Sequence, residues 1–470
     1  MNPMHKTLLT IAASALLLSA CGSVSTTGVR EHDSRQFAPA AELAFEARPG
    51  ARAYYGTYDG VQGPAVYAAE IPDNWNGGLV MYTHGYRGTG STLAPSPAPA
   101  AYRDTLLAAG YAWAASSYSA NFYDVRAGVE DTNQLALELP VYLARDWNVT
   151  IEQPTQYLIS GHSLGGHTAA AAVERENMQR TRYPVPYAGA APLCQAEQNQ
   201  FQWLGDYTRL AMTLAGFGYM PYERYPDLIG VLDGSGEPGP IVTNLFKVNP
   251  ETGQSTWEPA NLNGERLKAM AMQLTGGQRP IFDDGFGSRY QITVLSGGGD
   301  DGSVRGILSG NIYDNTGREY RWTDGAEPSA EEQAFNASIM RQSADRGVNP
   351  PRNDGVRWLP EVHGDFDVPV LTMHTLGDFY VPFVHQQLYR QGAIRNGNDH
   401  LLVQRAIRAP GHCDFSAEET QQALTDWLNW VNGGDKPAGD VVLDPVVVAD
   451  DNYGCTFTTP QRDGLPACSR

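Results

Sequence analysis

Residues 157–166 are Tyr157-Leu158-Ile159-Ser160-Gly161-His162-Ser163-Leu164-Gly165-Gly166, and this stretch decides the fold. Its first residues are apolar or small and predict a buried parallel strand. Gly161 and Gly165 then flank Ser163 as G-x-S-x-G, and residues 169–173 favour a helix. A serine on a sharp turn between a strand and a helix needs small neighbours, because the backbone there is strained and closely packed.

This arrangement predicts a nucleophilic serine. The turn raises the Ser163 hydroxyl above the sheet, and the N-terminus of the following helix favours negative charge. The pattern G-x-S-x-G also occurs by chance, so the alternative is an incidental match. The flanking strand and helix are the context that the motif requires, and partner residues follow in the expected order. We therefore predict that Ser163 is the nucleophile of a serine hydrolase.

A catalytic serine needs a base, and the base needs a third group that holds its tautomer. Residues 369–375 predict a buried strand, which runs into Leu376-Gly377-Asp378-Phe379-Tyr380-Val381-Pro382. Loops at the carboxyl ends of parallel strands hold the active sites of open α/β sheets. We predict Asp378 as the acid.

The base is predicted one strand later. Residues 401–406 form that strand, which leads into Ala409-Pro410-Gly411-His412-Cys413-Asp414-Phe415. His412 lies on a glycine-flanked loop before a helix that starts near Ser416. It follows Asp378 by 34 residues (412 − 378), which is room for one helix, one strand and a loop. The order Ser, Asp, His is the one expected for this type of turn.

Other histidines and aspartates are weaker candidates because of their positions relative to the strands. His84 lies in the predicted oxyanion loop, His162 and His167 lie on the serine turn, and His374 lies inside the acid's strand, where a core residue is expected. His363 and His385 have no acid and strand in the right relation, and His400 precedes the last strand. Asp365 and Asp367 precede the acid's strand. Asp414 is adjacent to the base and is expected to cap the following helix.

A second loop predicts the oxyanion hole, whose donors must point at the developing negative charge. Residues 78–83 form a strand, followed by His84-Gly85-Tyr86-Arg87-Gly88. We predict the N–H groups of Leu164 and Tyr86 as the two donors. The alternative is that His84-Gly85 is only a glycine turn.

These motifs resemble those of the α/β-hydrolase superfamily, within it the lipase and esterase branch. The resemblance covers about residues 50–434 and implies the α/β-hydrolase fold, a mostly parallel sheet with helices on both faces. It is specific for fold and reaction type, not for substrate. Gly411-His412-Cys413 is also similar to secreted feruloyl esterases and tannases, where this cysteine pairs with one beside the nucleophile. Position 162 is His here, so any such bridge needs another partner.

The chain has five cysteines. Cys455 and Cys468 lie in a Gly/Pro-rich tail and are expected to pair. Cys194 follows a predicted strand at the sheet edge that carries His412, so we predict a Cys194–Cys413 disulfide. Four cysteines allow three pairings, and two separate thiols are the other alternative, which an oxidising compartment disfavours.

The N-terminus predicts export. Lys6 and the apolar residues 8–18 have the length of a signal peptide, not of a membrane span. Leu18-Ser19-Ala20-Cys21 resembles a bacterial lipobox, which implies lipidation at Cys21 and a lipoprotein of the cell envelope, in the outer membrane if the host has one. The alternative is an ordinary signal peptide with an incidental cysteine.

Six segments are expected along the chain. They are a lipoprotein signal peptide (1–20), a tether (21–50), the first half of the core (51–194), a cap insertion (195–364), the second half of the core (365–434) and a tail (435–470). The insertion has 170 residues (364 − 195 + 1), far more than an ordinary connection. Amphipathic stretches near 204–214, 260–273 and 329–345 predict a mainly helical cap. Its aromatic residues are candidates for the pocket, or alternatively for the cap's own core: Trp203, Phe217, Tyr219, Tyr222, Tyr225, Trp257 and Phe286.

Composition excludes several classes of partner. The formal charge of −19 becomes −20 without Lys6 (−19 − 1), which argues against nucleic acid and anionic membrane surfaces. No Cys/His cluster has zinc spacing and no G-x-G-x-x-G follows a strand, so we expect no cofactor and no metal. Residues 297–302 predict a flexible turn.

We therefore expect a lipid-anchored enzyme that hydrolyses small or medium carboxylic esters. Two alternatives remain: an amidase or peptidase with the same triad, and a non-catalytic surface lipoprotein that uses the fold for binding. The sequence does not indicate an oligomeric state.

Overall fold

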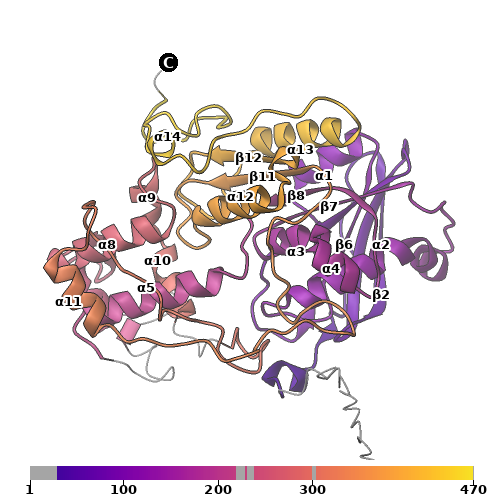
Figure 1. The fold of residues 1–470 in the computed structure, drawn as a ribbon. Helices are drawn as coiled ribbons and strands as arrows, with labels where there is room; N and C mark the ends of the chain where they lie inside the picture. Colours follow the sequence, from indigo (N-terminus) through magenta and orange to yellow (C-terminus); the bar gives the residue numbers. More distant parts are fainter. Residues whose placement is uncertain (1–28, 219–227, 230–237, 299–302, 469–470) are drawn as a thin grey trace, which may run out of the picture.

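The computed structural model describes residues 29–218, 228–229, 238–298 and 303–468. Within these ranges the core is an eight-stranded sheet with the order β12-β11-β8-β7-β4-β6-β3-β2 (Figure 1). Its strands are β2 (Ala51–Gly60), β3 (Gly63–Pro72), β4 (Gly78–Thr83), β6 (Ala112–Ser116), β7 (Gln156–His162), β8 (Tyr187–Leu193), β11 (Val370–Thr375) and β12 (Leu402–Ile407).

The sheet is mostly parallel. β3 runs antiparallel to both β2 and β6, whereas each pair from β6 through β4, β7, β8 and β11 to β12 is parallel. Every residue of β4, β11 and β12 is buried, as expected for strands that are covered on both faces. With the sharp serine turn at the end of the central strand β7, this architecture confirms the predicted α/β-hydrolase fold.

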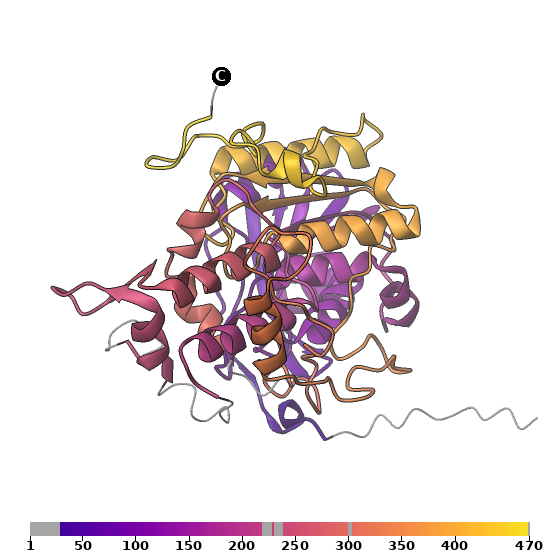
Figure 2. The ribbon, with the colours of Figure 1, turned by 60° about the vertical axis from the view of Figure 1, so that its left-hand side comes forward.

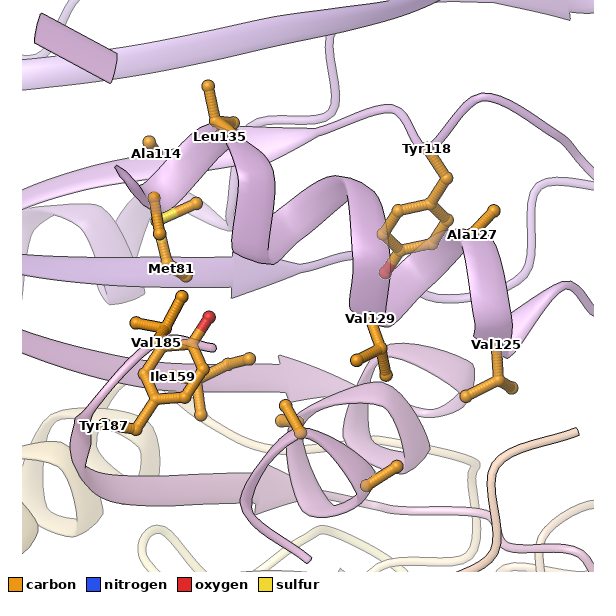
Figure 3. Packing of buried hydrophobic residues seen from close by; sticks show 14 of the residues in the cluster. Met81, Ala114, Tyr118, Val125, Ala127, Val129, Leu135, Ile159, Val185 and Tyr187 are labelled. Atoms are coloured by element: carbon orange, nitrogen blue, oxygen red, sulfur yellow. The ribbon is translucent and has the colours of Figure 1, made fainter. Parts of the chain in front are cut away.

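Helices cover the two faces of the sheet. One face carries α1 (Ala100–Ala108) and α13 (Ala417–Val431), and the other carries α2 (Val125–Trp147), α3 (Leu164–Val173) and α12 (Val384–Asn396). Two shorter helices are α4 (Arg175–Arg180), which follows α3, and α14 (Pro445–Val448), which lies in the C-terminal tail. Figure 3 shows Met81 and Ile159 of the sheet in the apolar cluster that also contains Val129 and Leu135 of α2.

The sequence pattern predicts a long helix around residues 132–146, and helix α2 begins seven residues earlier, at Val125 (132 − 125). Asp124 caps it, because its side chain accepts a hydrogen bond from the Ala127 N–H. All residues from Val125 to Asn133 are buried, so the first turns have no exposed face and no amphipathic period. Burial on all sides thus hid the start of this helix from sequence analysis.

The insertion between β8 and β11 begins with a helical part that has its own apolar cluster. Its elements are α5 (Gln200–Leu214), α7 (Pro240–Leu245), β9 (Phe246–Val248), β10 (Ser255–Pro259), α8 (Leu262–Leu274), α9 (Phe282–Phe286) and α10 (Tyr290–Gly297). Figure 2 shows these helices gathered beside the sheet. The antiparallel pair of β9 and β10 was not predicted.

Residues 303–364 differ from the prediction of a mainly helical insertion. Helix α11 (Ala330–Ser338) ends well before position 345, and the chain from Ile339 is extended. Arg341 holds this stretch, because its guanidinium donates to the carbonyl oxygens of Asn315 and Arg318. Apolar side chains of this part then join the main core cluster, among them Val304, Ile307, Leu308, Val356 and Leu359.

The N-terminal segment corrects the predicted tether. It contains η1 (Glu31–Ser34) and β1 (Ala38–Pro39), and β1 pairs with β5 (Thr92–Leu93). Arg30 and His32 are buried: the Arg30 guanidinium stacks on Trp358, and His32 Nε2 lies 3.0 Å from an Asp124 oxygen. A tether should be solvated, so that prediction is wrong for residues 30–40. Residues 1–28, with the signal peptide and Cys21, lie outside the described residues.

The tail from 435 to 468 packs against the core through Val442, Val448 and Tyr453, next to Ile281 and Leu376. The remaining short element is η3 (Asp399–Leu401), before β12. None of the helices in the described ranges is both long and apolar enough to span a membrane.

Candidate active site

Ser163 lies on the turn between β7 and α3 with φ 61° and ψ −121°. The flanking glycines are required because the end of the neighbouring strand β4 lies close beside the turn. A Cβ on Gly161 would lie 2.0 Å from Thr83 Oγ1, and a Cβ on Gly165 would lie 2.0 Å from the Thr83 carbonyl oxygen. The G-x-S-x-G pattern is therefore the steric condition for this turn.

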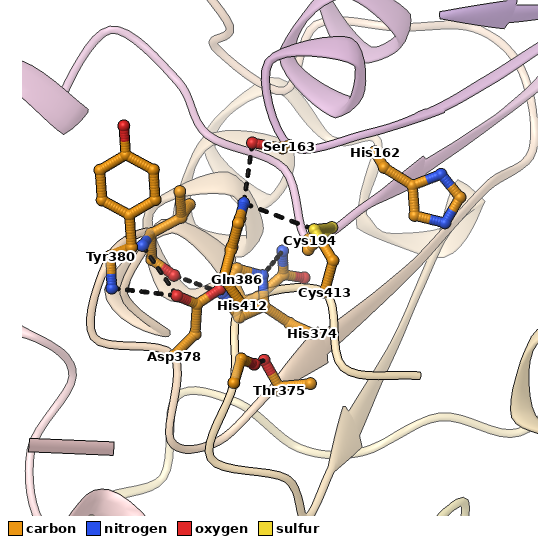
Figure 4. The surroundings of a disulfide bond; sticks show 12 residues. His162, Ser163, Cys194, His374, Thr375, Asp378, Tyr380, Gln386, His412 and Cys413 are labelled. Carbon is orange, nitrogen blue, oxygen red and sulfur yellow. Dashed lines mark hydrogen bonds and ion pairs between the residues drawn. A yellow bond between two sulfur atoms is a disulfide. The ribbon is translucent and has the colours of Figure 1, made fainter. Parts of the chain in front are cut away.

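The structure brings the three predicted catalytic residues together. His412 Nε2 lies 2.8 Å from Ser163 Oγ, and His412 Nδ1 lies 2.5 Å from Asp378 Oδ2 (Figure 4). Asp378 follows β11 and His412 follows β12, so all three residues sit at the carboxyl ends of parallel strands. This is the geometry in which a base can take the serine proton while a carboxylate holds the base.

The buried Asp378 carboxylate is held by its own loop. Its Oδ1 accepts hydrogen bonds from the N–H groups of Tyr380 (3.0 Å) and Val381 (2.9 Å). His374 donates from Nε2 to the Val381 carbonyl oxygen at 2.8 Å. Burial lowers the pKa of His374 to about 4, so this imidazole is neutral at pH 7. His374, predicted as a core residue, thus supports the acid's turn.

The predicted oxyanion loop lies against the nucleophile. A Cβ on Gly85 would be 3.4 Å from Ser163 Cβ, so the backbone of the loop passes close to the hydroxyl. The Tyr118 hydroxyl donates to the His84 carbonyl oxygen at 3.0 Å and its ring stacks on His84. Leu164 is the first residue of α3, where the N–H has no acceptor within the helix. The donor role of Tyr86 stays a prediction.

Two disulfides are present in the described part of the chain, Cys194–Cys413 and Cys455–Cys468, the pairs expected from sequence. Cys413 Sγ lies 3.4 Å from His412 Nε2, so the first bridge abuts the base. The side chains of Cys194, Cys413 and His412 form a cluster of the size of a metal site. The bridge consumes both thiols, and thiolates are the form that binds metal.

The competing histidines serve other roles. The Tyr123 hydroxyl donates to His167 Nδ1, and His167 Nε2 donates to the Pro360 carbonyl oxygen. His385 lies between Glu197 and Gln200. Burial lowers the pKa of His84, His162 and His167 to about 4 each, so these imidazoles are neutral at pH 7.

One further expectation is corrected, and one pair of alternatives is decided. Asp414 does not cap α13: Ser416 does, because its hydroxyl accepts from the Glu419 N–H. Trp203 and Phe286, predicted pocket candidates, are buried in the insertion's own cluster, and Phe217 and Trp257 pack against it. Their alternative interpretation as cap core is therefore the correct one. Tyr219, Tyr222 and Tyr225 lie outside the described residues, as do positions 299–302 of the predicted turn.

Sequence analysis missed two tyrosines beside the base. Tyr290, at the start of α10, and Tyr380 stack in parallel with 6.0 Å between ring centroids. Both present an edge-to-face ring to His412, at 6.3 and 5.5 Å. Tyr380 follows Asp378-Phe379 directly, so its position near the base could have been predicted from the sequence. No motif marks Tyr290.

A cleft of about 760 Å³ opens beside His412. Residues of three separate segments line it: the insertion around Arg289 and Tyr290, the loop from Pro410 to Asp414, and Leu465 of the tail. The insertion and the tail therefore both reach the edge of the catalytic site.

No family model matches this chain. An o-phthalyl amidase of Xanthobacter agilis is 23% identical over 410 residues, which cover 79% of this chain and 86% of that protein. Among solved structures, feruloyl esterase B of Aspergillus oryzae is similar with a TM-score of 0.42 and 13% identity, covering 83% of this chain and 82% of that one. A thermostable esterase of Pseudomonas putida ECU1011 has a TM-score of 0.36 and 11% identity, covering 83% and 82%. Since these scores lie below 0.5, the fold assignment rests on the strand order and the serine turn.

Proposed function

We propose that this α/β-hydrolase-fold protein is a serine hydrolase that cleaves carboxylic esters through an acyl-enzyme. The observation that carries the proposal is the continuous chain of contacts from Ser163 Oγ through the His412 imidazole to Asp378. The nucleophile, base and orienting acid each have the partner that acyl transfer needs. This assembled triad favours catalysis over a surface lipoprotein that only binds.

The reaction follows from these contacts. Ser163 Oγ attacks the ester carbonyl carbon while His412 Nε2 takes the hydroxyl proton. The N–H groups of Leu164 and Tyr86 stabilise the oxyanion, and Asp378 stabilises the imidazolium that forms. His412 then protonates the departing alkoxide. Water attacks the acyl-enzyme in the second half, with His412 again as base, and releases the acid.

An amidase is the second candidate, and the similarity to an o-phthalyl amidase over most of the chain supports it. The same triad cleaves an amide when His412 protonates the leaving nitrogen. The two candidates differ only in the leaving atom, so kinetics on matched substrates separates them.

The insertion is proposed to act as a cap, with a small or medium substrate held in the cleft beside His412. The presence of insertion residues 284–290 along that cleft supports this role. We also propose that Cys21 carries a lipid that anchors the exported protein to the cell envelope, in the outer membrane if the host has one. The sequence Leu18-Ser19-Ala20-Cys21 supports this anchor.

The test is covalent labelling of the purified mature protein with a fluorophosphonate probe, followed by mass spectrometry of the labelled peptide. We expect the label on Ser163 and its loss in His412→Ala. A folded protein that takes no label at Ser163 would contradict the proposal. An ester and an amide with the same acyl and aryl groups then decide the class: comparable kcat/KM on both favours the amidase.

A further inference from the structure

The C-terminal loop closed by Cys455–Cys468 lies where the substrate is expected. Leu465, inside this loop, lines the same cleft as His412, although the two residues are 53 positions apart (465 − 412). Tyr290 of the insertion lines it as well. The lining of the cleft next to the base thus includes an aromatic side chain from the insertion and an aliphatic one from the tail, beside the charged residues Asp284, Arg289 and Asp414.

This cleft belongs to the leaving-group side of the reaction. His412 Nε2 takes the proton from Ser163 and gives it to the leaving group, so the leaving atom must come within hydrogen-bond reach of this nitrogen. A group attached to that atom extends past the imidazole. His412 itself borders the cleft, together with Pro410 and Gly411 before it. The cleft beside the imidazole therefore lies within reach of such a group.

Two arginines fix the position of the tail loop, and the first of them is Arg408. The buried Arg408 guanidinium donates to the carbonyl oxygens of Asp451 (2.8 Å), Tyr453 (3.0 Å) and Pro466 (2.9 Å). Pro466 is the residue after Leu465. These bonds, with the disulfide, fix the backbone on which Leu465 is presented.

Arg462 ties the same loop to the base. Its Nη2 donates to the Asp414 carbonyl oxygen at 2.8 Å and to Glu419 Oε2 at 2.7 Å. The Glu419 side chain is fully buried, so this ion pair is screened little by solvent. Asp414 is two residues from His412, so the tail loop and the base are held in one fixed relation.

We infer that the disulfide-closed C-terminal loop is a specificity element of the proposed hydrolase, with Leu465 and Tyr290 contacting an aromatic leaving group. An aromatic ring that contacts both the tyrosine ring and the leucine side chain buries apolar surface against each of them. A small aliphatic leaving group offers less apolar surface to these two side chains. This inference rests on the proposed function and adds the class of the leaving group to it.

The test uses three esters of one acyl group, butyrate, with ethyl, benzyl and 2-naphthylmethyl leaving groups. We expect the wild-type protein to prefer the two aromatic esters over the ethyl ester by at least tenfold in kcat/KM. Leu465→Ala should lower kcat/KM for both aromatic esters about five- to tenfold, mainly through KM, because the apolar contact with the Leu465 side chain is lost. Hydrolysis of the ethyl ester should stay within twofold.

Leu465→Trp is the opposite change, since it fills the cleft. It should lower kcat/KM for the naphthylmethyl ester at least tenfold and leave the ethyl ester within twofold. Leu443→Ala is the matched control: Leu443 packs in the same tail but does not line the cleft. It should leave the ratio of benzyl to ethyl hydrolysis unchanged. Thermal unfolding and fluorophosphonate labelling of every variant establish that each is folded and assembled.

Equal use of ethyl and benzyl esters by the wild type, or Leu465 variants that change all three esters by one factor, would overturn the inference and leave the proposed function intact. A wild-type protein that takes no label and hydrolyses none of the esters would instead overturn the proposed function, and the inference with it.

Discussion

The sheet core and the insertion contribute to the active site in different ways. In the core, Ser163, Asp378 and His412 follow three parallel strands whose hydrogen-bonded ladders fix the spacing of the strand ends. The insertion has a separate apolar cluster and reaches the site through side chains and through close backbone contacts such as that between Gly285 and Gly377. Chemistry is therefore a property of the core, whereas the shape of the cleft depends on the insertion and the tail.

The acid's loop is where the two regions meet. Phe379, next to Asp378, belongs to the insertion's cluster, where Trp203, Tyr207 and Phe286 pack around it edge-to-face. Trp203 Nε1 also donates to the Phe379 carbonyl oxygen at 3.1 Å. The apolar cluster of the insertion is therefore in direct contact with the loop that carries the acid.

The buried Arg279 of the insertion strengthens this contact. Its Nε donates to the Leu376 carbonyl oxygen at 2.7 Å, two residues before the acid. Burial lowers the pKa of Arg279 to about 9, so the guanidinium remains charged at pH 7. This positive charge interacts electrostatically with the Asp378 carboxylate.

The largest effect is expected in the core. Ser163→Ala should lower kcat by about 10⁴- to 10⁶-fold, because without the nucleophile only oxyanion stabilisation and binding remain. Steady-state kinetics on the wild type's best ester measures this. Ser160→Ala is the control: the buried Ser160 hydroxyl donates to the Ala191 carbonyl oxygen, so its loss should cost stability and spare kcat. Ester hydrolysis by Ser163→Ala within a few-fold of wild type would refute the catalytic assignment.

The next effect tests the contact between insertion and acid loop. A Cβ on Gly285 would lie 1.7 Å from the Gly377 carbonyl oxygen, so Gly285→Ala must push the two regions apart. We expect kcat/KM to fall about 100-fold through misplacement of Asp378, and stability to fall by about 1–3 kcal/mol.

Gly317→Ala is the matched control for that change. Gly317 also lies in the insertion but does not line the cleft, and a Cβ there would meet no atom within 4 Å. Activity should be retained within about threefold, because this change does not displace Asp378. If both alanine variants behave alike, the contact at Gly285 does not position the acid.

The two disulfides should separate chemistry from specificity. Cys194→Ser/Cys413→Ser removes the bridge against His412 and should lower kcat about tenfold, since a loosened base loses its alignment. Unfolding stability should fall by about 3–5 kcal/mol, because the loop it closes spans 219 residues. Cys455→Ser/Cys468→Ser opens a span of 13 residues, should cost less stability, and should leave kcat on small esters unchanged. Equal loss of kcat in both double variants would contradict this division.

The smallest effect concerns the junction where the insertion returns to the core. The buried Glu174 carboxyl accepts hydrogen bonds from the N–H groups of Gly364 (2.8 Å) and Asp365 (3.0 Å). Burial raises the pKa of Glu174 from its ordinary value of 4.5 to about 7. Between these values the folded protein keeps a proton that the unfolded chain has lost, so this contribution to stability is lost as pH rises toward 7.

From pH 5 to pH 8 the unfolding free energy of the wild type should therefore fall by about 2–3 kcal/mol relative to Glu174→Gln, which cannot ionise. Urea unfolding of both proteins at the two pH values measures the difference. Glu152→Gln, at an exposed position, should instead run parallel to the wild type. Parallel curves for Glu174→Gln would mean that the carboxyl is ionised in the folded protein throughout this range.

Sequence analysis succeeded where local patterns decide the structure. The strands at 78–83 and 370–375 were predicted within a residue or two, because buried parallel strands are short apolar runs bounded by turn residues. Ser163, Asp378 and His412 were found from the strand that precedes each of them. The two disulfides followed from the same strand-end reasoning and from proximity in the tail.

It failed where contacts between distant segments decide. Arg30 and His32 belong to a segment with the polar sequence of a tether, but both are buried. Arg30 packs on the Trp358 ring, and His32 contacts the Asp124 carboxylate. Tyr290 carries no motif, yet the fold places it against His412.

Local patterns were enough to predict the α/β-hydrolase fold and the triad candidates, since apolar strand runs and glycine-flanked turns are local properties of the chain. The surroundings of the triad emerged from the folded molecule alone: the insertion packs on the acid's loop at Gly285, and the C-terminal loop lies beside the base at Leu465. The physical reason is that these contacts join segments tens to hundreds of residues apart. Their partners are selected by shape and burial, which leave no period and no spacing in the sequence.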